Sequence, residues 1–176
     1  MAPDSGTQHT DAGHSKEEQL SSLFDSCYPR LVRYAYARLG NPTEAEDVAA
    51  DVFVRAFESL NSYHERGFPM EAWLFRIARN LVVDHYRRSG RFVRSTEDEA
   101  ELPDSPDPSH IAEKGMLLED VKQAMQYLTQ DQSDVITMRF FGGLSSRETA
   151  AALGKSDGSV REMQRAALEK LRRLLK

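Results

Sequence analysis

The stretch LSSRETAAALGKSDGSVREMQRAALEKLRR, residues 144–173, carries the signals of two helices joined by a tight turn. Ser145 and Glu148 have the spacing of a capping box, and Gly154 suits a turn in which positive φ costs least. Ser156 then caps a second helix. The apolar residues of that helix recur at helical spacing: Val160, Met163, Ala167, Leu171 and Leu174. This pattern is typical of a helix-turn-helix, and an ordinary helical hairpin is the alternative.

The second helix of this pair carries groups suited to reading duplex DNA. A helix N-terminus favours phosphate, and Arg161 and Arg165 lie one turn apart on one face. We therefore predict that four residues contact DNA in the major groove: Ser156, Ser159, Arg161 and Arg165.

Two further helices are predicted before this pair. The first covers about residues 113–128. Thr129 and Gln132 form a capping box for the second, which ends at Gly142 and Gly143. Together with the helix-turn-helix they predict one helical domain over residues 113–176.

The segment STEDEAELPDSPDPSH, residues 95–110, has three prolines, dense acidic residues and few apolar ones. We interpret residues 93–112 as a flexible acidic linker. Residues 1–17 are polar without periodicity and are predicted to be a disordered tail.

Residues 18–92 predict a first helical domain. One helix begins near Glu17, and Pro29 is expected to bend or interrupt it. A second helix runs to about Leu60 from a predicted capping box of Thr43 and Glu46. Its apolar face is expected to contain Ala49, Phe53, Ala56, Phe57 and Leu60, opposite a face rich in acidic residues. A loop over residues 61–70 precedes a third helix over about 71–88. The fold class is therefore all-α, with two small helical domains.

The third helix lies in the stretch WLFRIARNLVVDHYRRSGR, residues 73–91, which is rich in arginine and aromatic residues. Single-stranded nucleic acid is held by stacking aromatics in a positive groove. Trp73, Phe75 and Tyr86 could stack on bases, and each could equally pack in the core. The arginines favour nucleic-acid contact over a merely solvated face.

Charge is distributed in blocks along a chain whose net charge is −5. Residues 66–94 and 155–176 are basic, whereas residues 41–60 and 95–120 are acidic. This pattern indicates two local contacts with nucleic acid. The sequence contains no long apolar run and no secretory signal, which predicts no membrane insertion. The lone Cys27 suits a cytoplasmic protein.

Two long segments resemble one known family. EAEDVAADVFVRAFESL and FPMEAWLFRIARNLVVDHYRR look like regions 2.2 to 2.4 of bacterial extracytoplasmic-function (group 4) sigma factors. LTQDQSDVITMRFFGGLSSRETAAALGKSDGSVREMQRAALEKLRRLL resembles region 4 of the same family. The resemblance covers residues 18–92 and 113–176, which makes the two predicted domains sigma regions 2 and 4.

The resemblance implies a function in transcription initiation. It implies binding to bacterial core RNA polymerase, with Glu46, Asp47 and Asp51 docking on the coiled coil of the β′ subunit and region 4 touching the β flap. It implies that region 4 reads the −35 promoter element and that region 2 melts the −10 element. The implied −10 contacts are Trp73, Arg76, Arg79, Asn80, His85, Arg87 and Arg88. A cognate anti-sigma factor is the further implied partner, and no cofactor is expected.

Two other functions remain as alternatives. A stand-alone helix-turn-helix regulator would bind duplex DNA without polymerase, but it would leave the acidic and arginine-rich helices of the first domain without a purpose. An enzyme is disfavoured because the five histidines lack ligand spacing and no phosphate loop or nucleophile elbow occurs. We therefore expect no catalytic residue and no metal site.

Overall fold

The computed structural model describes residues 11–65, 67–90 and 114–176, with side chains described from Lys16 and from Glu119 in the two helices at the edges of these ranges. Every regular element in these ranges is helical. They are α1 (Asp11–Leu39), α2 (Pro42–Glu58), a 3-10 turn η1 (Leu60–Ser62), α3 (Met70–Arg88), α4 (Lys114–Met125), α5 (Gln130–Ile136), a π-type turn η2 (Thr137–Phe141), α6 (Ser146–Leu153) and α7 (Asp157–Leu174). The all-α prediction is confirmed. The predicted linker, residues 93–112, and residues 1–10 of the predicted tail lie outside the described residues.

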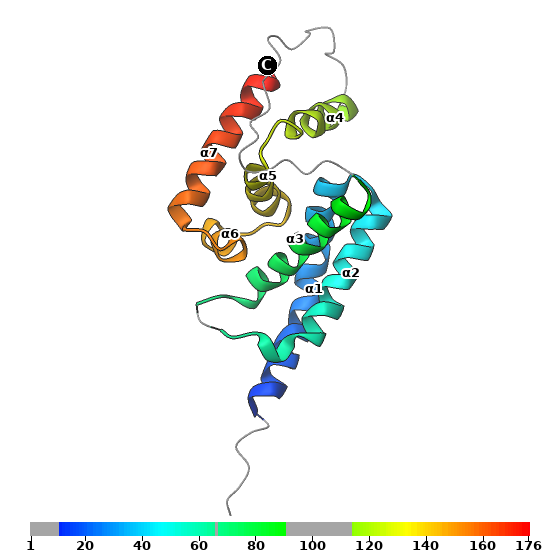
Figure 1. The fold of residues 1–176 in the computed structure, drawn as a ribbon, viewed down its shortest axis with the longest axis vertical. Coiled ribbons are helices and arrows are strands. Elements are labelled where there is room, and N and C mark those ends of the chain that lie inside the picture. The colour runs from blue at the N-terminus through cyan, green and yellow to red at the C-terminus, as the bar shows by residue number, and fades with distance from the viewer. Residues whose placement is uncertain (1–10, 66, 91–113) are drawn as a thin grey trace, which may run out of the picture.

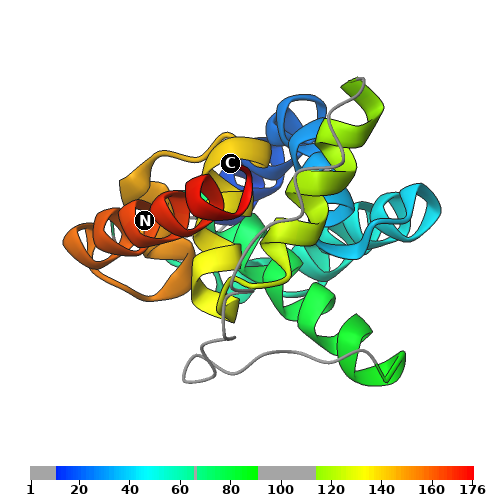
Figure 2. The ribbon, with the colours of Figure 1, turned by 90° about the horizontal axis from the view of Figure 1, so that it is seen from above.

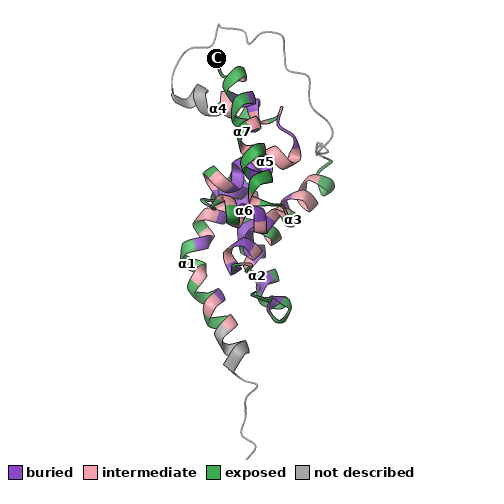
Figure 3. Cartoon of the chain, turned by 90° about the vertical axis from the view of Figure 1, so that its left-hand side faces the viewer, coloured by how far each residue is buried: buried purple, intermediate pink, exposed green. Residues whose placement is uncertain are grey.

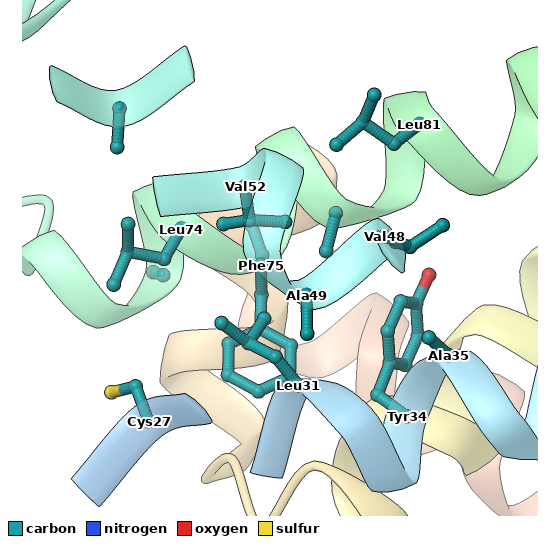
Figure 4. Packing of buried hydrophobic residues seen from close by; sticks show 14 of the residues in the cluster. Cys27, Leu31, Tyr34, Ala35, Val48, Ala49, Val52, Leu74, Phe75 and Leu81 are labelled. Carbon is teal, nitrogen blue, oxygen red and sulfur yellow. The ribbon is translucent and has the colours of Figure 1, made fainter. Parts of the chain in front are cut away.

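Helices α1, α2 and α3 pack into a bundle around one apolar core (Figure 1). Figure 4 shows Phe75 of α3 beside Leu31 of α1, with Ala49 and Val52 of α2 closing over them. Phe75 and Tyr34 meet edge to face, with ring centroids 5.7 Å apart. The small residues of α2 let the three helices approach closely, so the large side chains of α1 and α3 fill the space between them.

Helix α1 differs from its prediction at two places. It begins at Asp11 rather than near Glu17, and it continues through Pro29 without a break. Pro29 is exposed, whereas Cys27 and Leu31 on either side of it are fully buried. Burial of the apolar face therefore outweighs the roughly 3 kcal/mol that an interior proline costs a helix. At the start of α1, each added residue gains a backbone hydrogen bond without a new nucleation step.

Helix α2 also corrects two predictions. Its N-cap is Asn41, whose side chain accepts from the Glu44 amide at 3.1 Å, and not the Thr43–Glu46 box. Pro42 occupies the first helical position, where its fixed φ is favourable, so the helix begins before Thr43 can cap it. Phe57 is 64% exposed rather than part of the apolar face. At 100° per residue it points about 80° away from Ala49, outside the buried sector.

Helices α4 to α7 follow their predicted caps closely. Both predicted capping boxes, at Thr129 and at Ser145, are formed with both of their hydrogen bonds. Gly154 ends α6 with φ 65°, and Ser156 caps α7 by accepting from the Ser159 amide. The left-handed backbone at Gly154 turns α7 away from α6, as a helix-turn-helix requires.

The two helical units pack directly against each other. Met138, Leu144 and Ala152 belong to the same buried cluster as the core of α1 to α3. Figure 3 shows buried residues concentrated where α5 and α6 meet α3. α7 and α2 lie on opposite sides of the molecule in both views (Figures 1 and 2). The sequence predicted two domains but not this contact between them.

Candidate nucleic-acid interface

The predicted reading surface of α7 is open to solvent. Ser156, Ser159, Arg161 and Arg165 are all exposed, while Val160 and Ala167 on the other face of the helix are fully buried. The hydroxyl oxygen of Ser156 accepts the Ser159 amide, so Ser156 has a structural role as well. The packing of α7 on α5 and α6 thus presents its N-terminal half outward.

Among the described residues, the two arginines of α7 that are predicted to contact DNA pair only with acidic residues of their own helix. Arg161 lies 3.1 Å from Asp157, and Arg165 binds Glu162 at 2.5 Å and Glu169 at 2.8 Å. A hydrogen bond from Arg165 lowers the pKa of Glu162. These exposed pairs are screened by water and salt, so DNA acceptors can replace them at little cost. Glu162 itself lies on this open face, where a carboxylate can accept from a cytosine amino group.

The predicted DNA-contacting residues of α3 differ in their surroundings: some are exposed to solvent and others contact another helix. Asn80, Arg87 and Arg88 are exposed. Trp73 is half-buried, with its ring 5.0 Å from that of Tyr63. These four positions are free, wholly or in part, to meet a ligand.

Arg76 and Arg79 instead contact the second helical unit. Arg76 donates from Nε to the Ala152 carbonyl at 3.3 Å and from its terminal nitrogen to the Ala151 carbonyl at 3.2 Å. Arg79 donates from Nε to the carboxylate of Asp134 at 2.7 Å. The donors that were predicted to contact DNA are therefore engaged by oxygen atoms of α5 and α6.

Asp134 is the centre of this contact. Its side chain is fully buried and also binds Arg38 of α1, whose side chain is only 6% exposed. Burial disfavours the charged guanidinium of Arg38, but the Asp134 carboxylate outweighs this and the pKa of Arg38 is raised. Arg79 shows the same balance of burial against Asp134, again with a raised pKa. The buried carboxylate is thus held between two arginines of the other unit.

His85 differs from the other predicted DNA residues in its partner, which is a side chain of α2. Its Nε2 is 3.3 Å from a carboxylate oxygen of Glu44 at the start of α2, and both side chains are partly buried. In this structure His85 therefore links α3 to α2. Phe75 and Tyr86, for which stacking was considered, also face inward: Phe75 is fully buried, and the Tyr86 hydroxyl donates to the Arg38 carbonyl.

The exposed face of α2 combines acidic and apolar side chains. Glu46, Asp47 and Asp51 are all exposed, as a docking surface would require. Val54 and Phe57 are 54% and 64% exposed and project from the same side of the helix. We call these five residues the α2 docking face. The apolar part of this face was not predicted, because the helical spacing of the sequence placed Phe57 on the core side of the helix.

No cluster of three or more metal-ligating side chains occurs in the described ranges. None of the helices in the described part of the chain combines the length and apolarity needed to cross a membrane. The described structure has three surfaces that could bind a partner: the exposed face of α7, the partly covered basic face of α3, and the acidic and apolar face of α2.

Comparison with known proteins identifies the family. The family model described as Sigma-70 region 2 matches residues 23–92, and Sigma-70, region 4 matches residues 124–173. The chain is 35% identical over 162 residues to the ECF RNA polymerase sigma factor ShbA of Streptomyces griseus, covering 86% of this chain and 85% of the relative. The chain belongs to the ECF family of RNA polymerase sigma factors.

Two other relatives support this assignment. The ECF sigma factor BldN of Streptomyces coelicolor is 35% identical over 162 residues, which cover 90% of this chain and 61% of BldN. Among solved structures, the sigma factor RpoE from Bartonella quintana, in complex with the anti-sigma factor NepR, is similar with a TM-score of 0.60 and 25% identity. That match covers 92% of this chain and 96% of the other. In this sigma factor, region 2 therefore includes most of α1, α2 and α3, and region 4 includes α5 to α7.

Proposed function

We propose that this chain binds bacterial core RNA polymerase, recognises −35 and −10 promoter elements, melts the −10 region and directs transcription initiation. The single observation that carries the proposal is that one sigma-family chain presents both an open recognition helix and the α2 docking face, on opposite sides. A DNA-reading surface and a protein-docking surface can then be occupied together.

Each surface has chemistry suited to its proposed partner. On α7, Ser159, Arg161 and Arg165 offer donors for phosphate and base edges at the −35 element. On α3, Trp73, Asn80, Arg87 and Arg88 offer stacking and positive charge for an unpaired −10 strand. On α2, exposed Phe57 beside acidic residues fits a partner that is both apolar and basic, which we assign to the β′ coiled coil.

Two separate weak contacts fit a subunit that works only within a larger assembly. Tethering on polymerase raises the effective concentration of each DNA-binding unit at its element. We propose that the catalytic chemistry belongs to polymerase, that the chain itself is no enzyme, and that it acts in the cytoplasm. An anti-sigma factor is a further proposed partner, because the similar sigma factor RpoE was solved in complex with the anti-sigma factor NepR.

The test is transcription by core polymerase from a promoter library, with and without this chain. We expect added chain to give defined start sites whose upstream sequences share two spaced motifs. Core polymerase alone is the control. If no start sites arise while the chain alone shifts duplex DNA, it is an independent helix-turn-helix regulator and the proposal is wrong.

A further inference from the structure

We infer that region 4 closes on region 2 in the free chain and competes with DNA for the basic face of α3. The inference rests on the proposed DNA role of α3. In the closed chain, the Asp134 carboxylate accepts from Arg79, and the Ala151 and Ala152 carbonyls accept from Arg76. A promoter strand would need these same arginine donors. Opening of this contact then becomes a condition for promoter recognition.

The contact has the composition of a specific interface. Arg30 donates from Nε to the Gly142 carbonyl at 2.7 Å and from a terminal nitrogen to the Gly143 carbonyl at 3.2 Å. Arg33 donates to the Phe141 carbonyl at 3.3 Å. These bonds satisfy backbone carbonyls at the end of η2 and in the turn that follows it. In the described part of the chain, five arginines of region 2 donate to region 4: Arg30, Arg33 and Arg38 from α1, and Arg76 and Arg79 from α3.

Close apolar packing supports the polar contacts. Gly142 is buried, and a Cβ at this position would lie 2.6 Å from Cε1 of Phe75. Met138 and Leu144 on either side of Gly142 are almost completely buried in the core shared with region 2. The side chain of Phe75 thus touches region 4 directly, and the two units fit without a gap at this point.

Asp134 ties region 4 to one position on region 2, because its partners are two arginines of that region. Its carboxylate is fully buried only because region 4 lies against α1 and α3, where Arg38 and Arg79 neutralise it. Removing one member of such a buried ionic group leaves an unpaired charge, which is strongly unfavourable. The Tyr34 hydroxyl is also buried nearby and makes no hydrogen bond among the described residues. The interface therefore depends mainly on the Asp134 pairs for its electrostatic balance.

The closed state cannot read both promoter elements at once. The names −35 and −10 place these elements about 25 base pairs apart, which corresponds to about 85 Å of duplex. In the structure, Arg76 of α3 binds Ala152, and Asp157 at the start of α7 follows Ala152 by five residues. An extended chain of five residues spans at most about 18 Å. The two units must therefore separate before α3 and α7 occupy their elements together.

The first test measures closure itself, without polymerase or DNA. Spin labels are placed on exposed positions of the full chain, Asn61→Cys in region 2 and Arg173→Cys in region 4, with buried Cys27 replaced by alanine. The distance distribution is then compared for Asp134→Asn and for the control Asp131→Asn, whose carboxylate pairs with Lys155 inside region 4. Helix content by circular dichroism confirms that each variant is folded.

The turn η1, which contains Asn61, and the C-terminal end of α7 lie toward opposite ends of the molecule (Figure 1), so closure fixes one defined distance rather than a short one. We expect a single narrow distance distribution for the otherwise unchanged chain and for Asp131→Asn, and a broad distribution for Asp134→Asn. Loss of the buried pair should lower the closed-to-open ratio at least about 100-fold. Arg38→Gln removes the same pair from the region 2 side and should also open the chain. A broad distribution without substitution, or an unchanged narrow distribution in both Asp134→Asn and Arg38→Gln, would overturn the inference.

The second test measures competition with DNA. The probe is fluorescent single-stranded DNA of random sequence, about 12 nucleotides long, because stacking sites of this kind tolerate many sequences. Apparent affinity rises with the fraction of molecules that are open, so Asp134→Asn should bind about tenfold more tightly or better, and Asp131→Asn should not. Opening without tighter binding would show that region 4 does not compete with DNA. If the transcription test fails, the proposed function is wrong. The distance measurement would still show whether region 4 closes on region 2, because it uses neither polymerase nor DNA.

Discussion

Two helices of this sigma factor, α3 and α7, hold their predicted DNA-contacting arginines in opposite surroundings. Arg76 and Arg79 of α3 bind atoms of the other helical unit, and one of these partners, Asp134, is fully buried. Arg161 and Arg165 of α7 bind acidic residues of their own helix in solvent. Exposed pairs exchange easily for phosphate or bases, whereas the buried group must be taken apart. Under the proposed function, Arg161 and Arg165 can therefore exchange their partners for DNA in the free chain, whereas Arg76 and Arg79 must first leave the other helical unit.

The largest expected effect concerns the buried side of α3. Phe75→Ala removes a fully buried ring that contacts Tyr34 and lies against Gly142. We expect the free energy of unfolding to fall by about 3–5 kcal/mol, measured by urea denaturation. The matched control is Phe57→Ala, whose ring is 64% exposed and whose loss should change stability by less than about 0.5 kcal/mol. Equal losses in the two variants would contradict the assignment of Phe57 to a docking face.

The open arginines of α7 give the next effect. Arg161→Ala or Arg165→Ala should lower transcription that depends on the −35 element by about tenfold to a hundredfold, since each removes a proposed base or phosphate contact. Transcription from promoters with altered −35 sequences measures the change in preference. Arg173→Ala, at an exposed position near the end of α7, is the control. An unchanged promoter preference would show that Arg161 and Arg165 do not read the −35 element.

The α2 docking face gives a smaller effect. Asp51→Arg reverses an exposed charge and should weaken binding to core polymerase about tenfold without unfolding the chain. Fluorescence anisotropy with labelled chain measures the affinity. Glu17→Arg makes an equal charge reversal at an exposed position of α1 and should leave the affinity for core polymerase unchanged. If both variants bind like the original chain, the acidic residues of α2 are only solvated.

The smallest expected effect is at Gly158 in the first turn of α7. A Cβ here would meet nothing within 4 Å, and the backbone does not require positive φ. Gly158→Ala should therefore raise the free energy of unfolding by about 0.4–1 kcal/mol. If α7 enters the groove closely, the added methyl group should at the same time lower transcription dependent on the −35 element. A gain in stability with unchanged transcription would show that Gly158 does not approach DNA.

Local signals in the sequence predicted much of region 4. The boxes at Thr129 and Ser145, the turn at Gly154 and the cap at Ser156 are all formed by residues within a few positions of each other. Predictions failed where packing outweighs a local preference, as at Pro29, or where one cap competes with another, as at Asn41. The proposed DNA contacts and the domain boundaries stay predictions.

The contact between the units could not be predicted from residue patterns. Arg79 and Asp134 are 55 positions apart, and nothing in the spacing of either residue indicates its partner. The other acceptors are backbone carbonyls, such as those of Gly142 and Ala152, which every residue type possesses. The same arginines therefore fit DNA or a protein partner equally well in the sequence, and only the fold distinguishes these uses.

The most direct test of this account compares one distance in two states of the same protein. The labels at positions 61 and 173 are measured in the free chain and after assembly with core polymerase on a promoter found in the library experiment. We predict one narrow distance distribution in the free chain and a clearly longer distance in the assembly, where the two promoter elements are roughly 85 Å apart. The same distance in both states would contradict the account, because α3 and α7 would then be unable to hold the two elements together.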